Sequence, residues 1–132
     1  MSLCFCHSNK SYEDCCRPYH LGKEAPTALA LMRSRYSGYA LGLVQYIIDT
    51  THPSSSLYIK NLNTWKRDIL KFSRETKFCK LEIIDFEEVG PNRATVTFHA
   101  YLEQQGKEVI LKEKSTFLKE SGRWLYYSGE FS

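Results

Sequence analysis

Four cysteines lie within the first sixteen residues, and their spacing constrains this chain more than any other feature. Cys4 and Cys6 flank a single residue, eight residues follow, and Cys15 and Cys16 are adjacent. Four thiolates can bind one Zn²⁺ in a closed tetrahedral site, with each pair of cysteines supplying one edge. The intervening segment contains Asn and Ser, which favour the chain reversal that such a site needs. We therefore predict a structural zinc site formed by these four side chains.

Two other interpretations of the cysteines remain open. A disulfide between Cys15 and Cys16 would be strained, because bridged Cα atoms are usually at least about 4.4 Å apart and neighbouring ones lie at about 3.8 Å. A redox-active pair usually has two intervening residues, and that spacing is absent here. His7 and His20 are rival ligands. Because four thiolates already complete a zinc site, we expect both histidines to be solvated or hydrogen-bonded locally.

The segment resembles the SEC-C motif, a small zinc-binding segment also found at the C-terminus of the SecA translocation ATPase. The matching pattern is Cys4-x-Cys6-x-Ser8-x-Lys10-x-Tyr12-x-x-Cys15-Cys16. Phe5 stands where the motif commonly has Pro, and His7 and Asn9 stand where it commonly has Gly. The resemblance implies zinc as the metal and a protein partner for the knuckle, since similar segments contact proteins elsewhere. Lys10 and Arg17 are close enough in sequence to offset part of the negative charge of the thiolates.

Helices are predicted after a polar linker at 17–25. Apolar residues recur in steps of three and four from Leu29 to Ile47, which marks one face of a helix. Gly42 predicts a break, so we expect one helix over about 27–40 and a shorter one ending near 49. A loop at 50–56 surrounds His52, and a further helical face runs from Tyr58 to Phe72.

Four strands are predicted beyond Lys77, where the apolar period changes to two. Turn residues at 90–92, 105–107 and 120–122 separate them. The apolar parity changes between Ile83 and Ile84, which predicts a bulge, and we expect Cys79 to be buried as a small apolar residue. Helices first and antiparallel strands afterwards indicate an α+β fold, with helices packed on one face of a curved sheet.

Glu113 shares a strand face with apolar residues, so the sequence leaves two interpretations open. Both faces of the strand can carry a mixture of polar and apolar residues, with Glu113 exposed at an edge. Alternatively, Glu113 can point inward. An inward carboxylate must be paired, protonated or near water. Candidate partners on the preceding helix and loop are Arg33, Arg35, Tyr36, Tyr39 and His52. In the inward case Arg35, Tyr39, His52 and Glu113 are the predicted lining of a ligand pocket.

Nearly the whole chain resembles the YchJ family, whose members join a SEC-C motif to a nuclear transport factor 2-like domain. The matching stretches are Ala28-Leu29-Ala30-Leu31-Met32-Arg33-Ser34-Arg35-Tyr36, Thr51-His52-Pro53, Glu113-x-Ser115-x-Phe117 and Gly122-Arg123-Trp124-x-Tyr126. The resemblance implies a zinc-binding motif at 1–22 and, at 26–132, a cone of curved sheet capped by helices. Lys112 and Thr116 stand where the family often has His and Arg.

Two functions fit these observations. A closed four-thiolate site has no open position for water, which favours a non-enzymatic interaction module with a structural zinc ion. The alternative is a small-molecule binder, or an isomerase- or dehydratase-like enzyme, that uses the cone. In that case Glu113 would act as acid or base, His52 would lie at the rim, and Arg35 and Tyr39 would contact an anion or carbonyl. Whether the chain is an enzyme is left open by the sequence.

The charge and hydropathy of the chain bear on nucleic-acid binding, membrane insertion and location. The formal net charge is +3 and the charges are scattered, so no basic cluster indicates a nucleic-acid surface. No apolar run approaches the length of about 18 residues that a transmembrane helix needs. The first residues lack a basic segment followed by an apolar stretch. We therefore expect no membrane partner and a cytoplasmic location.

Overall fold

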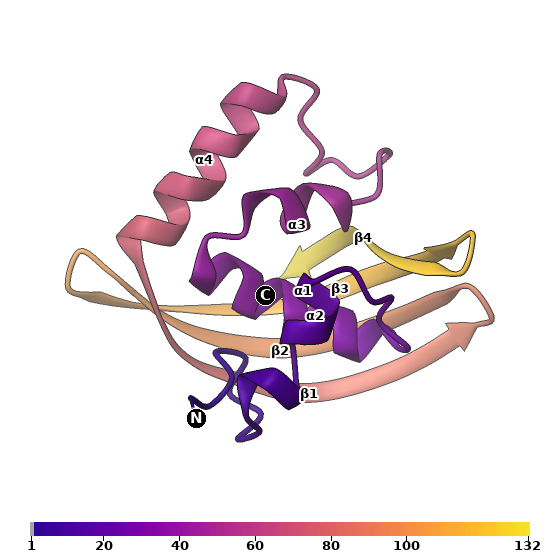
Figure 1. The fold of residues 1–132 in the computed structure, drawn as a ribbon, viewed down its shortest axis with the longest axis horizontal. Helices are drawn as coiled ribbons and strands as arrows, with labels where there is room; N and C mark the ends of the chain where they lie inside the picture. The colour runs from indigo at the N-terminus through magenta and orange to yellow at the C-terminus, as the bar shows by residue number, and fades with distance from the viewer. Residues whose placement is uncertain (1) are drawn as a thin grey trace.

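The structure is a computed structural model that describes residues 2–132 of the chain. Two short helical turns come first, followed by three helices and then four strands. Their bounds are η1 (Tyr12–Asp14), α1 (Arg17–His20), α2 (Ala28–Leu41), α3 (Val44–Asp49), α4 (Leu62–Glu75), β1 (Thr76–Gly90), β2 (Arg93–Gln104), β3 (Lys107–Glu120) and β4 (Arg123–Phe131). Figure 1 shows the helices gathered over one side of a curved sheet. No helix within residues 2–132 is both long and apolar enough to cross a membrane.

Local signals explain where the helices begin and end. The Thr27 hydroxyl accepts a hydrogen bond from the backbone N–H of Ala30 at 3.0 Å and caps α2. Gly42 adopts a left-handed φ of 71°, which ends α2 at the predicted break. The prediction of a simple linker at 17–25 was wrong in part, because a helical turn forms there with Pro18 in its first turn.

The strands form one antiparallel sheet in the order β1-β2-β3-β4. The predicted bulge in β1 is confirmed by a register shift between Ile83 and Asp85, and two further shifts occur between Phe78 and Lys80 and near the end of the strand. Bulges bend a strand, so β1 curves along its length (Figure 1). Cys79 lies at the first shift and is exposed, not buried as predicted. The predicted α+β architecture is confirmed.

The core has two parts. The larger part packs α2 against the inner face of the sheet, and its fully buried centre includes Leu31, Val96 and Phe117. The smaller part joins α3 to α4 around Ile47 and Trp65. α4 packs on α2, α3 and β1, and the helices do not close completely over the inner face of the sheet. The space left between α2, α4 and the sheet is the cavity described below.

Candidate functional site

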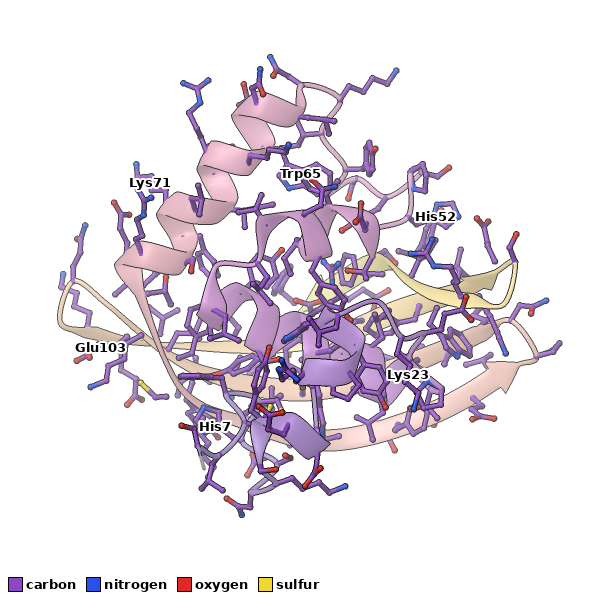
Figure 2. The ribbon with its side chains drawn as sticks, in the orientation of Figure 1. His7, Lys23, His52, Trp65, Lys71 and Glu103 are labelled. Atoms are coloured by element: carbon purple, nitrogen blue, oxygen red, sulfur yellow. The ribbon has the colours of Figure 1, made fainter. Side chains whose placement is uncertain are left out.

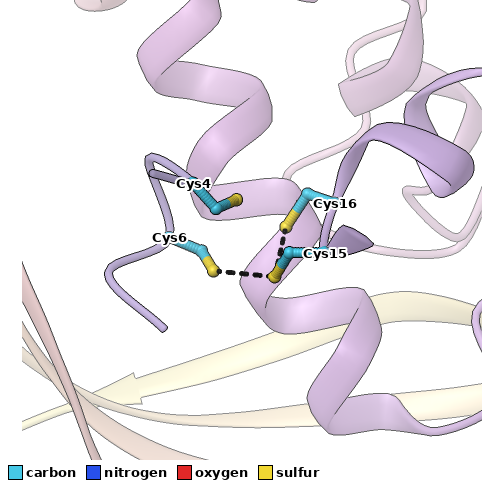
Figure 3. A group of neighbouring side chains, drawn as sticks. All are labelled: Cys4, Cys6, Cys15 and Cys16. Carbon is cyan, nitrogen blue, oxygen red and sulfur yellow. Dashed lines mark hydrogen bonds between the residues drawn. The ribbon is translucent and has the colours of Figure 1, made fainter. Parts of the chain in front are cut away.

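The four cysteines predicted as ligands converge on one point (Figure 3). Their sulfur atoms all lie within 4.8 Å of one another. Cys6 Sγ lies 3.5 Å from Cys15 Sγ, and Cys15 Sγ lies 3.9 Å from Cys16 Sγ. A disulfide bond has a length of about 2.05 Å, and all of the cysteines are free. The cluster is therefore compatible with binding of a metal ion.

A short antiparallel contact between Leu3 and Ser11 reverses the chain and brings the two cysteine pairs together. The backbone N–H of Cys4 donates to the carbonyl of Lys10 at 2.8 Å within this turn. Ser11 then caps η1, because its hydroxyl accepts from the backbone N–H of Asp14. The reversal that the spacing predicted is thus formed mainly by the backbone, leaving the thiols free to face one another.

Two residues of this loop adopt backbone conformations that favour glycine. His7 has a φ of 62° and Asn9 a φ of 68°. Asn tolerates this left-handed region, whereas His is less well suited to it. The His7 side chain offsets the cost through contacts with the rest of the molecule. Its Nε2 lies 3.2 Å from the carbonyl of Phe78, and its ring packs edge-on against Tyr36 at 5.9 Å.

Arg33 on α2 reaches the cysteine cluster. Its Nη1 donates to the carbonyl of Cys6 at 3.2 Å and lies 4.0 Å from the Cys6 sulfur. Arg17, one of the two cations predicted to offset the thiolate charge, instead pairs with Glu13 at 3.2 Å. Arg33 was also a predicted partner for Glu113. It lies at the knuckle and does not line the cavity that contains Glu113.

His20 ties the same segment to α2 and uses both ring nitrogens to do so. Its Nδ1 lies 2.6 Å from the Tyr12 hydroxyl, and its Nε2 lies 2.8 Å from the carbonyl of Ser34. Burial lowers the pKa of His20, which favours the neutral ring. Both histidines are hydrogen-bonded to groups other than the cluster, His7 to the distant Phe78 and not locally as expected. The metal-ligand group within residues 2–132 consists of four cysteines.

The thiols influence one another strongly. A hydrogen bond from Cys16, with smaller ones from its neighbours, lowers the pKa of Cys6 to about 4. Burial raises the pKa of Cys4 to about 11, and a hydrogen bond to Cys6 together with burial raises that of Cys16. Without a cation, one thiolate is therefore stabilised by the remaining thiols. A divalent ion would replace their protons and relieve the mutual repulsion of four thiolates.

A cavity of about 450 Å³ lies between α2, α4 and the inner face of the sheet. Most of its wall is apolar and includes Met32, Tyr36, Leu57, Ile59, Trp65, Ile69, Phe72, Phe78, Phe98, Ala100, Leu102, Leu111, Phe117 and Phe131. The polar side chains of the lining are few: Arg35, Tyr39, Asp68, Glu113, Ser115 and Tyr126. A mostly apolar pocket of this size with a few convergent polar groups is typical of small-molecule sites.

Glu113 lies in this cavity, so the inward interpretation of its strand is the correct one. Its carboxyl group is buried, with an exposed fraction of 9% for the residue. The Oε2 atom accepts hydrogen bonds from the hydroxyl of Ser115 and, at 3.2 Å, from that of Tyr126. Burial raises the pKa of Glu113, although these two hydrogen bonds and the charge of Arg35 act in the opposite direction.

Three of the four predicted pocket residues meet in the cavity, and His52 does not. His52 Nε2 lies 2.7 Å from Glu120 Oε1, and the ring packs edge-on against Tyr127. Figure 2 shows His52 near the edge of the molecule, beside β4. The cause is a backbone contact between distant segments, because the backbone N–H of His52 donates to the carbonyl of Tyr126. This contact fastens the loop to the outer edge of β4 and directs the imidazole toward the turn between β3 and β4.

The sequence of this chain matches a known protein family. Residues 27–129 match the sequence profile of the middle, nuclear transport factor 2-like domain of YchJ, which is more than half of the chain. The chain belongs to the YchJ family. A UPF0225 protein from Vibrio parahaemolyticus is 37% identical over 98% of this chain and 75% of its own length.

Solved structures of similar proteins carry the same two parts. A SEC-C motif containing protein from Rhodopseudomonas palustris is 35% identical, with a TM-score of 0.81 over 96% of each chain. A SEC-C motif containing protein from Psychrobacter arcticus is 30% identical, with a TM-score of 0.77 over 95% of this chain and 75% of the other. A SEC-C motif in both relatives agrees with the N-terminal cysteine cluster of this YchJ-family chain.

The two positions at which the chain departs from the YchJ pattern of the third strand face away from the cavity. Lys112 and Thr116 alternate with Glu113 and Ser115 along β3, and side chains on a strand alternate between its two faces. Lys112 is exposed, whereas Glu113 and Ser115 are buried. These departures therefore leave the composition of the cavity unchanged.

Sequence reasoning did not assign Ser115 and Tyr126 to the site. Both donate hydrogen bonds to Glu113. Ser115 could have been found, because it lies two residues beyond Glu113 and so shares its strand face. Tyr126 belongs to another strand. The register shift between β3 and β4 at Thr116 and Phe117 means that alternation alone does not predict on which face of the sheet Tyr126 lies.

Gly129 is the residue that leaves room for this polar group. It pairs with Ser115 across β3 and β4. A Cβ at Gly129 would lie 2.7 Å from the Tyr126 hydroxyl and 2.7 Å from Cδ of Glu113. We expect Gly129→Ala to lower the free energy of unfolding by about 1–3 kcal/mol, because overpacking forces these side chains to move. Urea unfolding measures this loss.

Gly90→Ala is the matched control for that variant. Gly90 also lies at the end of a strand, but a Cβ there would meet no atom within 4 Å. The control should therefore unfold within about 0.5 kcal/mol of the unmodified chain. Equal stabilities for the two variants would contradict the close packing of Glu113 and Tyr126 over Gly129.

Proposed function

We propose that this protein binds a small organic molecule in the cavity between its helices and sheet, and that a zinc ion in the cysteine cluster fixes the N-terminal knuckle against α2. The single observation that carries the proposal is the buried group of Arg35, Glu113 and Tyr126 in an otherwise apolar cavity of about 450 Å³. A protein core without a ligand rarely keeps such space open, because interiors are close-packed.

Zinc suits the donor set of the knuckle. Tetrahedral Zn–S bonds of about 2.3 Å require sulfur–sulfur separations of about 3.8 Å. The separations of 3.5 and 3.9 Å bracket this value. Soft thiolate ligands in a group of four favour zinc over hard cations. Four protein ligands leave no coordination position for water, which supports a structural role for the ion.

Binding is favoured over acid–base catalysis by what the cavity contains. Glu113 has the raised pKa that a catalytic acid or base needs. The histidine predicted to act with it, His52, lies outside the cavity and contacts Glu120. Asp68 on α4 is the other acidic side chain of the lining, but no hydrogen bond within residues 2–132 connects it to Glu113. The polar groups are thus arranged to hold a ligand.

A neutral apolar dye, N-phenyl-1-naphthylamine, tests the binding proposal. The unmodified protein should increase the fluorescence of the dye with a saturable, one-to-one stoichiometry. Ala100 lies on the cavity wall, so Ala100→Phe should fill part of the cavity and weaken dye binding at least tenfold. The measurement is a fluorescence titration of both proteins.

Thr97→Phe is the matched control, because it adds a phenyl ring to the opposite face of the same strand. This control should bind the dye as the unmodified protein does. Failure of the unmodified protein to bind the dye, or equal weakening by both substitutions, would refute the cavity as the binding site.

A protein interaction through the knuckle is a second candidate function. Leu3 and Phe5 lie on the knuckle loop and are exposed to 61% and 46%. Two exposed apolar side chains beside a rigid metal site could anchor a partner. A partner that copurifies with the unmodified protein should be lost with Phe5→Ser and kept with Ile110→Ser, an exposed apolar position on β3. Loss with neither or with both would count against this role.

A further inference from the structure

Arg35 is a buried cation whose hydrogen bonds use one of its three guanidinium nitrogen atoms. The residue is 5% exposed. Its Nη1 atom donates to the carbonyl of Ile47 at 3.1 Å and to the hydroxyls of Thr50 and Thr51 at 2.8 and 3.0 Å. Within residues 2–132, no acceptor contacts its Nε or Nη2 atoms. These donors belong to a side chain that lines the cavity.

No carboxylate forms an ion pair with Arg35 within the part of the chain that the structure describes, although its charge acts on the nearby Glu113. The ion pairs there involve Arg17, His52 and His99, and none includes Arg35. Glu113 lines the same cavity but accepts its hydrogen bonds from Ser115 and Tyr126. A buried charge that lacks an ionic partner is costly. The contacts of Arg35 with neutral oxygens hold the guanidinium in place without cancelling its charge.

Two aromatic rings also contact this guanidinium. Its central carbon lies 4.8 Å from the ring centre of Tyr126 and 6.0 Å from that of Tyr39. Such contacts stabilise a cation and fix the plane of the guanidinium. The Tyr39 ring packs edge-on against Phe72, and its hydroxyl has no hydrogen-bond partner among the described residues. Tyr39 therefore adds a second unused donor to the same lining.

Several apolar side chains of the lining, together with the acidic side chain of Asp68, reach the surface. Leu57, Ile59 and Phe131 line the cavity and are exposed to 37%, 37% and 67%. Apolar side chains such as Phe98 and Leu102 cover much of the remaining wall. The lining thus combines the buried cation Arg35 with a large apolar surface, part of which is exposed to solvent. A molecule that matches both features has one anionic head and an apolar body.

We propose that the ligand is an amphipathic carboxylate whose oxygen atoms accept hydrogen bonds from Nε and Nη2 of Arg35 and from the hydroxyl of Tyr39. The inference rests on the proposed binding function and names the chemical class of the ligand. A planar carboxylate matches the paired donors of a guanidinium. Its apolar body lies among the aromatic side chains, with the free end toward Leu57 and Phe131.

The state of Glu113 is consistent with an anion beside Arg35. Burial raises the pKa of its carboxyl group, which favours the neutral, protonated form. A neutral carboxyl group does not repel a ligand carboxylate. The charged and titratable groups that line the cavity are Arg35, Tyr36, Tyr39, Asp68, Glu113 and Tyr126. Arg35 is the one cation of this lining.

Displacement of the bound dye by decanoate and by 1-decanol tests the inference. The two probes share a ten-carbon chain and differ in the carboxylate. We expect decanoate to displace N-phenyl-1-naphthylamine at a concentration at least tenfold lower than 1-decanol. Tyr39→Phe should reduce this preference about tenfold, because it removes one charge-assisted hydrogen bond. Arg35→Met should abolish it.

Arg35 also holds the backbone near Thr50, so Arg35→Met could fail to fold, and Tyr39→Phe then decides. Equal displacement by the two probes, displacement by neither, or a preference that is undiminished in Tyr39→Phe and in any folded Arg35→Met would overturn the carboxylate assignment. Each of these results would leave the proposed binding function intact. Absence of dye binding by the unmodified protein would instead refute the proposed function, and the inference with it.

Discussion

Removal of the metal, or Cys16→Ser, is expected to unfold residues 2–22 and to leave the helices and sheet folded. Structural zinc binds with a free energy on the order of 10–16 kcal/mol, which acts as folding energy. The knuckle's own secondary structure contributes little, because η1 and α1 span only three and four residues and such short helices are unstable alone. An ¹H–¹⁵N spectrum recorded before and after chelation measures the change for each segment.

Cys79→Ser is the matched control for this prediction, since Cys79 is exposed and lies outside the cluster. The control should keep about one zinc per chain by metal analysis, whereas Cys16→Ser should lose it. Retention of zinc and of dispersed knuckle signals in Cys16→Ser would contradict the assigned ligands. Collapse of the whole spectrum would show instead that the larger domain depends on the metal.

Phe117→Ala is expected to lower the free energy of unfolding of the larger domain by about 3–5 kcal/mol. The side chain is 1% exposed and belongs to the main core. Its ring packs edge-on against Tyr126 at 5.8 Å. Truncation therefore removes apolar burial and leaves additional empty volume beside the cavity. Urea unfolding followed by circular dichroism measures the loss.

Phe131→Ala controls for the loss of an aromatic ring. Phe131 is 67% exposed, so its truncation should change the free energy of unfolding by no more than about 0.5 kcal/mol. Both variants should keep their zinc, because neither residue contacts the knuckle. A loss below about 1 kcal/mol for Phe117→Ala would contradict the independent core that we assign to the larger domain.

The parts predicted from the sequence are those specified by local patterns. The paired spacing of Cys4, Cys6, Cys15 and Cys16 is sufficient to predict their convergence, because each pair acts as one unit and the loop between them is short. The break at Gly42 follows from the freedom of glycine to adopt a positive φ. The bulge after Ile83 follows from a change of parity that a regular strand cannot accommodate.

The parts that sequence reasoning missed depend on contacts between distant segments. A helical pattern shows that Arg33 and Arg35 point in different directions, but it does not show that Arg33 faces the knuckle and Arg35 the cavity. The position of His52 is set by backbone pairing with Tyr126, which leaves no local signal. Cys79 is exposed because a register shift at Phe78 and Lys80 interrupts the alternation.

The location of bound N-phenyl-1-naphthylamine tests the central claim, that the cavity is a binding site, most directly. Nuclear Overhauser contacts between the dye and protein methyl groups would identify the surface it occupies. We expect contacts with Met32, Leu102 and Leu111, which line the cavity. Contacts confined to Ile84, Val89 and Ile110, which are exposed on the sheet, would contradict the account.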